Sequence, residues 1–145
     1  MAIPNPKFED SYGRLFGPDV SLNQDADQFF YRFYDRFLQS DEIAELFRET
    51  DMDNQVQMLK KSLLNLVAFY VTGQPGPELA RIGQIHKSLR VTQGMFDQWL
   101  MALIDTVSEL DEQADEETRL AWYWAMTPGV TYMQLAIAGA LVDPS

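Results

Sequence analysis

Helix-length segments with apolar side chains spaced about 3.6 residues apart dominate the sequence. No run of β-branched residues alternates with polar ones over a useful length, so strands are not expected. Short polar or Pro/Gly-containing stretches, such as GQPGP at 73–77, separate the segments. We therefore predict an all-α domain of about six to seven helices. The expected helices span 7–16, 25–39, 41–47, 51–71, 78–89, 92–110 and 116–141.

The length of the chain and the positions of its proline and glycine residues indicate how it is organised. The 145 residues suffice for one domain with a proper core and are few for two, so residues 1–145 are expected to form a single domain. Residues 1–20 are expected to contribute one short helix and a loop. Pro128 and Gly129 are expected to kink or break the last helix, because proline lacks the amide donor that a helix interior requires.

The formal charge of −11 disfavours nucleic acids and anionic membranes as partners. The absence of cysteine excludes disulfides, iron–sulfur clusters and thiolate metal sites. The longest apolar stretch, 133–142, is too short to span a bilayer, and the polar N-terminal sequence does not resemble a signal peptide. We expect a soluble, cytoplasmic protein without a membrane partner.

The only histidine of the chain, His86, shares a predicted helical face with Leu79, Ile82 and Leu89. A histidine on such a face is either a core residue bonded to a carbonyl or a metal ligand inside an apolar pocket. No cysteine is present and no carboxylate lies three or four residues away, so a zinc site is disfavoured. One imidazole is sufficient for haem, because the porphyrin supplies four nitrogen ligands.

Two stretches resemble bacterial globins: RFYDRFLQSDEIAELF at 32–47 and IHKSLRVTQGMFDQWLMALIDTV at 85–107. The resemblance is to single-domain haemoglobins, to the globin part of flavohaemoglobins and to globin-coupled sensors, and it extends over about residues 25–135. It implies a globin fold around a haem pocket, with haem b (iron protoporphyrin IX) as cofactor. It further implies reversible binding of a diatomic gas, O₂, NO or CO, at an iron ligated by His86.

The resemblance also implies roles for individual residues. Tyr34 matches the distal tyrosine of these globins, and Phe47 matches the phenylalanine that stacks on the porphyrin. Gln55 matches the distal polar position, and it is preferred to Gln57 because it shares a face with Leu59 and Leu63. The predicted cofactor-binding residues are His86, Phe47, Tyr34, Gln55, Leu59, Leu63, Ile82, Leu89, Val91, Phe96 and Trp99, with His86 as the metal ligand. Trp99 is read either as a further donor to the gas or as a plain core tryptophan.

The sequence departs from flavohaemoglobins on the proximal side. Phe96 stands where they have a tyrosine, and QLAIAGAL (134–141) carries no acid where they have a glutamate. A histidine without a carboxylate partner donates less electron density to iron, which disfavours peroxidase or dioxygenase turnover. No reductase domain is present in the sequence, so NO dioxygenase activity would require a separate reductase. Distal donors instead predict tight binding and slow release of O₂.

Four readings stay open. The first is a gas-binding haem protein, and the second is a sensor or regulator that acts through a protein partner. The third is a haem-free globin-fold regulator in which His86 is a core residue, and the fourth is an unrelated helical adaptor. Arg81, Lys87 and Arg90 are read as partners of the haem propionates or as solvated surface charges. Aromatic residues of the last helix, Trp122, Tyr123, Trp124 and Tyr132, suggest a homodimer.

Overall fold

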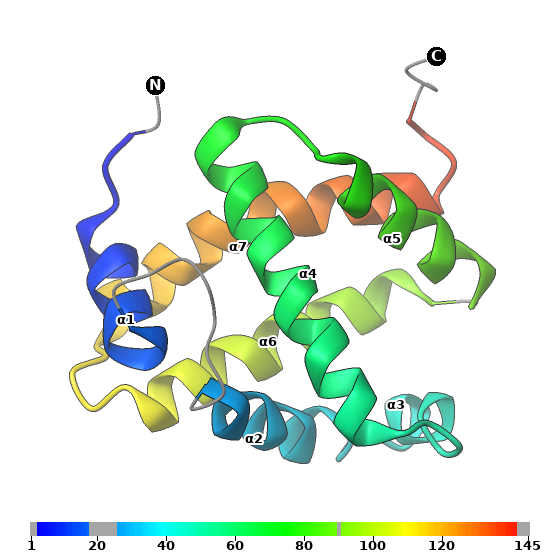
Figure 1. The fold of residues 1–145 in the computed structure, drawn as a ribbon, viewed down its shortest axis with the longest axis horizontal. Helices are drawn as coiled ribbons and strands as arrows, with labels where there is room; N and C mark the ends of the chain where they lie inside the picture. Colours follow the sequence, from blue (N-terminus) through cyan, green and yellow to red (C-terminus); the bar gives the residue numbers. More distant parts are fainter. Residues whose placement is uncertain (1–2, 18–25, 90, 142–145) are drawn as a thin grey trace.

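A computed structural model describes residues 3–17, 26–89 and 91–141 (Figure 1). Within these ranges the chain forms seven helices and no strand, which confirms the predicted all-α class. The helices are α1 (Pro6–Phe16), α2 (Asp27–Phe37), α3 (Asp41–Leu46), α4 (Met52–Thr72), α5 (Pro77–Ser88), α6 (Gln93–Leu110) and α7 (Glu116–Ile137). None of them is long and apolar enough to cross a membrane.

Local signals explain where the longer helices begin and end. The Asp51 carboxylate accepts hydrogen bonds from the backbone amides of Asp53 and Asn54 at the start of α4. Thr92 and Asp115 cap α6 and α7 in the same manner, and such caps stabilise a helix by about 1 kcal/mol each. α7 ends four residues before the predicted residue 141. Gly139 follows its end with φ +70°, the left-handed conformation that commonly stops a helix.

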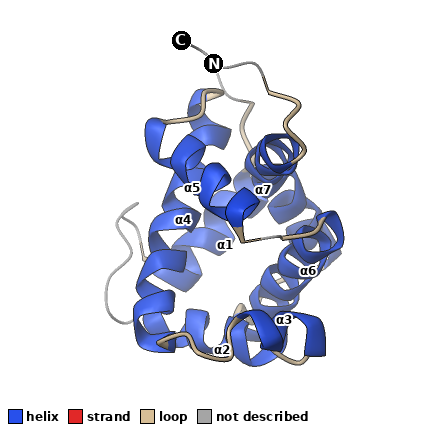
Figure 2. Ribbon diagram, turned by 90° about the vertical axis from the view of Figure 1, so that its right-hand side faces the viewer, coloured by secondary structure: helices blue, strands red, loops and turns tan. Residues whose placement is uncertain are grey.

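The helices pack in crossing pairs around one core. α7 is central, because it contacts α1, α4, α5 and α6, while α2 packs on α6. Figure 2 shows α4 and α5 on one side of the molecule and α6 on the other, with α2 and α3 at the lower end. Side chains that are fully buried include Phe30, Phe33, Leu63, Leu103, Ile104, Trp122 and Met126. Their burial is the main force that holds the helices together.

α7 continues through Pro128, so the predicted break is not found. The helix persists because it is buried on both sides of the proline, through Ala125 and Met126 before it and Val130 after it. Gly129 has a separate role at this point. A Cβ atom on Gly129 would lie 2.3 Å from Cδ2 of Leu66, so glycine permits the close crossing of α4 and α7.

We expect Gly129→Val to lower the free energy of unfolding by about 1–3 kcal/mol, the usual cost of overpacking a core. The added side chain would push Leu66 out of its buried position on α4. Urea denaturation followed by circular dichroism measures the change. Gly13→Val in α1 is the matched control, because nothing lies within 4 Å of a Cβ there. Equal effects at the two positions would contradict the close crossing.

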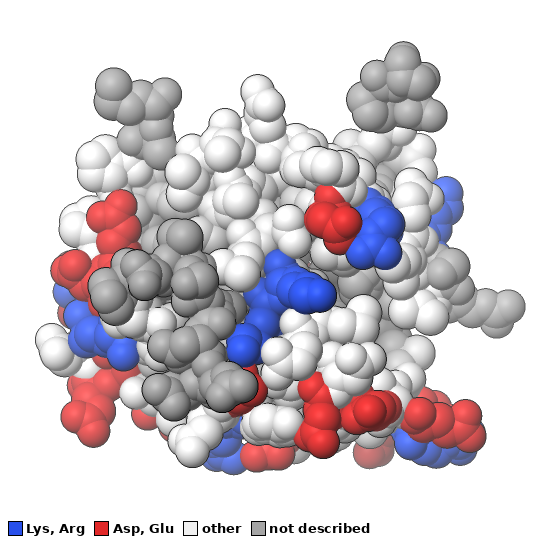
Figure 3. All heavy atoms as spheres, viewed as in Figure 1, with Lys and Arg blue, Asp and Glu red and all other residues white. Residues whose placement is uncertain are grey.

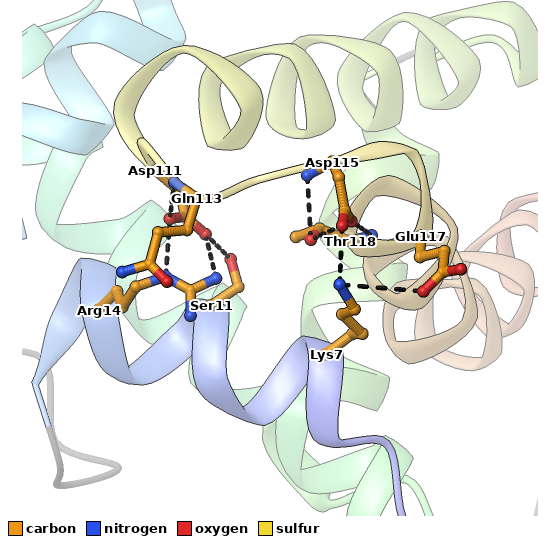
Figure 4. A network of polar contacts seen from close by, with 8 residues as sticks. All are labelled: Lys7, Ser11, Arg14, Asp111, Gln113, Asp115, Glu117 and Thr118. Atoms are coloured by element: carbon orange, nitrogen blue, oxygen red, sulfur yellow. Dashed lines mark hydrogen bonds and ion pairs between the residues drawn. The ribbon is translucent and has the colours of Figure 1, made fainter.

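Polar contacts hold α1 on the turn between α6 and α7 (Figure 4). Asp111 accepts hydrogen bonds from Ser11 Oγ (2.6 Å) and from Arg14 Nε and Nη2 (2.7 and 2.9 Å). The indole N–H of the buried Trp122 donates to Ser11 Oγ at 2.9 Å. Lys7 pairs with Asp115 at 2.7 Å. The short N-terminal helix predicted from the sequence is therefore anchored on the core by both charges and packing.

We expect Asp111→Asn to lower the free energy of unfolding by about 1–3 kcal/mol at neutral pH, the range for a buried hydrogen-bonded group that loses its charge. Burial would raise the pKa of Asp111, but hydrogen bonds from Arg14, Ser11 and the Gln113 amide outweigh it and lower the pKa. A lowered pKa in the folded state means that the stabilisation is complete above the ordinary aspartate pKa and is lost as pH falls through the lowered value.

Denaturation at a series of pH values tests this expectation. The difference between wild type and Asp111→Asn should be largest near neutral pH and should shrink in acid. Glu112→Gln, at an exposed carboxylate next in the sequence, serves as the control and should change little. A difference that stays constant down to strongly acidic pH would show that the charge of Asp111 does not stabilise the fold.

Candidate functional site

A deep cleft lies between α4 and α5 on one side and α6 on the other. α2 and α3 close its lower end, and α7 contributes at the opposite end. The space inside it, including open solvent at the mouth, is about 1010 Å³. The lining residues are Tyr34, Phe37, Ile43, Leu46, Phe47, Gln55, Met58, Leu59, Ser62, Leu66, Leu79, Ile82, Ile85, His86, Val91, Met95, Phe96, Trp99, Val130 and Met133. The lining is mostly apolar, with a few polar groups that could orient a ligand.

Nine of the eleven predicted cofactor-binding residues line this cleft. They are Tyr34, Phe47, Gln55, Leu59, Ile82, His86, Val91, Phe96 and Trp99. Leu63 is instead fully buried in the core. Each step of four residues overshoots a helical turn by about 40°, so two steps from Gln55 carry Leu63 away from the cleft face. Leu89 is 56% exposed, because α5 ends at Ser88 and Leu89 lies at its C-cap.

His86 lies in the last turn of α5, and its imidazole is oriented by its own helix. Nδ1 is 2.8 Å from the carbonyl oxygen of Ile82, one turn earlier. Because a carbonyl only accepts, Nδ1 carries the proton and donates it in this contact. In the neutral imidazole, Nε2 is then the unprotonated nitrogen, the form in which histidine ligates metals. The imidazole also packs against the ring of Phe96, with centroids 6.0 Å apart.

The polar pair formed by Tyr34 and Gln55 lies elsewhere in the cleft wall. Gln55 Nε2 donates a hydrogen bond of 3.1 Å to the hydroxyl oxygen of Tyr34. Burial raises the pKa of Tyr34 to about 12, although the bond from Gln55 acts in the opposite direction. The phenol is therefore protonated at neutral pH. Because its oxygen accepts from Gln55, its own O–H proton is available to a ligand in the cleft.

Aromatic rings hold Tyr34 in place. The rings of Phe33 and Phe47 meet it edge-on, with centroids 5.0 and 5.8 Å away. Trp99, on α6, lines the same cleft and packs edge-on against Phe33 at 5.9 Å. Edge-on pairs of this kind add about 0.5–1.5 kcal/mol each beyond simple burial. The phenol of Tyr34 is thus fixed by packing before any ligand enters.

Comparison with known protein families identifies the family of this chain. A family model described as bacterial-like globin matches residues 19–127. The chain belongs to the bacterial-like globin family. None of the curated proteins compared with it matches the sequence. Among solved structures, it is similar to a Pseudomonas aeruginosa PAO1 protein described as structurally highly homologous to a human haemoglobin. That likeness has 31% sequence identity and a TM-score of 0.75, and it covers 91% of this chain and 96% of the other.

The family membership confirms the resemblance inferred from the sequence, and the similar structure confirms the globin fold. In this globin, the described residues contain no group of three or more histidine and carboxylate side chains that could hold a metal ion by themselves. The cleft wall contains the imidazole of His86 and the protonated phenol of Tyr34.

Eleven residues of the cleft wall were not among those predicted from the sequence: Phe37, Ile43, Leu46, Met58, Ser62, Leu66, Leu79, Ile85, Met95, Val130 and Met133. Some of them could have been found from helical spacing. Ser62 and Leu66 follow Gln55 and Leu59 on one face of α4, with Met58 at its edge. Val130 and Met133 come from α7, and no local pattern connects them to His86. Their place depends on how α7 crosses the globin core.

The three basic residues that the sequence analysis considered as partners of the haem propionates, Arg81, Lys87 and Arg90, have different surroundings. Arg81 pairs with Glu78 at 2.7 Å on the surface of α5. Lys87 Nζ lies 3.8 Å from the Cβ position of Gly139, next to the C-terminal end of α7, where a cation interacts favourably with the helix dipole. Arg90 lies outside the described residues.

Proposed function

We propose that this globin binds haem b in the cleft, with His86 as the iron ligand, and that it reversibly binds a diatomic gas. The hydrogen bond from His86 Nδ1 to the Ile82 carbonyl carries the proposal, because it selects the neutral tautomer whose Nε2 can ligate a metal in an apolar cleft. Metal-ligating histidines regularly donate their other ring N–H in this way. The apolar lining and the aromatic ring of Phe47 suit a large, flat macrocycle.

Haem would supply an iron with one coordination position open to O₂, NO or CO. The polypeptide would supply polarity on the gas side. The Tyr34 hydroxyl, supported by Gln55, would donate to the gas ligand, and a hydrogen bond to a partly charged acceptor contributes about 1.5–3 kcal/mol. Because Tyr34 is fixed by Phe33 and Phe47, little ordering is needed when the gas arrives.

The surroundings of His86 favour gas binding over redox turnover. Its Nδ1 partner is a neutral carbonyl, and the ring of Phe96, which packs against it, has no acidic group. A neutral partner leaves the imidazole with little anionic character, so it would donate weakly to iron. This argument favours an O₂-binding protein over an NO dioxygenase.

Titration of the purified protein with haem tests the proposal. We expect a sharp Soret band that saturates at one haem per chain, and a further shift of this band when CO is added to the reduced sample. Circular dichroism on the same sample reports whether the protein is folded. A well-folded helical protein that leaves the spectrum of free haem unchanged would contradict the proposal and favour the haem-free regulator.

A further inference from the structure

Three apolar residues of the cleft wall mark its mouth, because they are partly open to solvent. Leu46 is 42% exposed, Met58 is 49% exposed and Ile85 is 37% exposed. They come from α3, α4 and α5, so the mouth is bounded by these three helices. A flat ligand with a polar edge would place that edge here, since the deeper wall is buried and apolar.

Basic side chains flank the mouth on its α4 and α5 sides. Lys61 follows Met58 by three residues on α4, and Arg81 precedes Ile85 by four residues on α5, so each lies about one helical turn from a mouth residue. Figure 3 shows blue groups over α4 and a red and blue pair over α5 on the same face. Both Lys61 and Arg81 are exposed.

Glu78 interacts with both of these cations. Its carboxylate pairs with Arg81 at 2.7 Å. The hydrogen bond and the charge of Arg81 lower the pKa of Glu78, and the charge of Lys61 lowers it further. The field of Lys61 therefore reaches a carboxylate on the neighbouring helix, which places the two cations and Glu78 in one surface group.

The α3 side of the mouth is rich in negative charge instead. Asp41, Glu42, Glu45 and Glu49 are all exposed there, next to Leu46. Arg48 is the cation among them, and it pairs with Glu45 at 3.3 Å. A carboxylate placed on this side would be repelled, while on the α4 and α5 side it would meet positive charge.

Lys61 is also available to a new partner. No carboxylate of the described residues lies within 4.0 Å of its Nζ atom, and the same holds for Lys87. Each other described lysine and arginine has such a partner. Lys87 lies beside Gly139 at the end of α7. Lys61 is therefore the cation at the mouth with no described partner of its own.

We propose that Lys61 and Arg81 bind the carboxylates of the ligand that fills the cleft, so that haem is held with its propionates on the α4 and α5 side of the mouth. The inference rests on the proposed function. Glu78 opposes this binding, because it competes for Arg81 and adds a negative charge beside the propionates. The three residues thus set how strongly the mouth retains a dicarboxylate, while His86 ligates the iron.

Transfer of haem from the loaded globin to an excess of an apoglobin acceptor measures this retention. We expect Lys61→Met to release haem about three- to tenfold faster, since the variant loses an exposed ion pair to a propionate. Glu78→Gln should act in the opposite direction and slow the release. Lys7→Met, which removes an exposed cation that pairs with Asp115 and does not line the cleft, is the control and should leave the rate unchanged.

The dimethyl ester of haem separates charge recognition from general packing, because it lacks the two carboxylates. With the ester, Lys61→Met and wild type should lose the cofactor at the same rate, and added salt should have little effect. Equal rates for all variants with ordinary haem would overturn the inference while the proposed function stands. The same fold-change with the ester would also overturn it. A wild type that takes up neither compound would overturn the proposed function as well.

Discussion

Tyr34→Phe is expected to speed the release of O₂ from the haem-loaded protein by about one to two orders of magnitude. The substitution removes a single hydroxyl that is buried, protonated and held by Gln55. A hydrogen bond to a partly charged acceptor contributes about 1.5–3 kcal/mol, and each 1.4 kcal/mol is about a factor of ten. Stopped-flow mixing of the oxygenated protein with excess CO measures the dissociation rate.

Two controls separate the hydroxyl from changes in packing. Bound CO is less polar than bound O₂, so its dissociation rate should change much less in the same variant. Tyr31→Phe removes a hydroxyl from an exposed tyrosine of α2, which bonds Asp53 on the surface, and should have no effect. Gln55→Leu should also speed O₂ release. If the O₂ dissociation rate is unchanged in both Tyr34→Phe and Gln55→Leu, these two residues do not stabilise the bound gas and their assignment to the distal side is wrong.

His86→Gly is expected to weaken haem binding by more than about a hundredfold. Mutation of residues that only support a metal ligand costs about 10- to 100-fold in affinity, and loss of the ligand itself should cost more. Imidazole added to the variant should restore the spectrum of the wild type, because a free ring can enter the space that the side chain leaves. Haem titration with and without imidazole measures both effects.

Gln84→Ala, at an exposed position of the same helix, is the control for His86→Gly and should bind haem normally. Circular dichroism establishes that both variants keep their helices. If His86→Gly binds haem as tightly as wild type and with the same spectrum, another group holds the iron and the candidate site is wrong.

The helices were predictable because their signals are local. Apolar spacing located α4, and Asp51 and Gly73 mark its ends through a side-chain cap and a residue with φ +74°. The break that was one of the two outcomes expected at Pro128 does not occur, because packing overrides local preference there. Pro128 would break an isolated helix, but α7 is buried on both sides of it and continues. The role of Gly129 could not be foreseen either, because it depends on Leu66 of another helix.

Some residues of the candidate site could likewise be predicted from local spacing, whereas others depend on contacts between helices. The spacing on α5 that placed His86 with Leu79 and Ile82 is local, and all three side chains line the cleft. Leu89 continues that spacing in the sequence, but the helix ends one residue earlier and Leu89 lies at its C-cap. The pairing of Tyr34 with Gln55 joins two helices, and only the resemblance to known globins suggested it. The contribution of α7 to the cleft arises from the tertiary crossing and left no sequence signal.

Resonance Raman spectroscopy of the ferrous protein tests the central claim most directly. His86 is the only histidine in the chain, so ¹⁵N-labelled histidine in protein without a histidine tag marks a single imidazole. Our account predicts an iron–nitrogen stretching band that moves to lower frequency in the labelled, haem-loaded sample. A band at the same frequency in labelled and unlabelled protein would show that the iron is not held by His86.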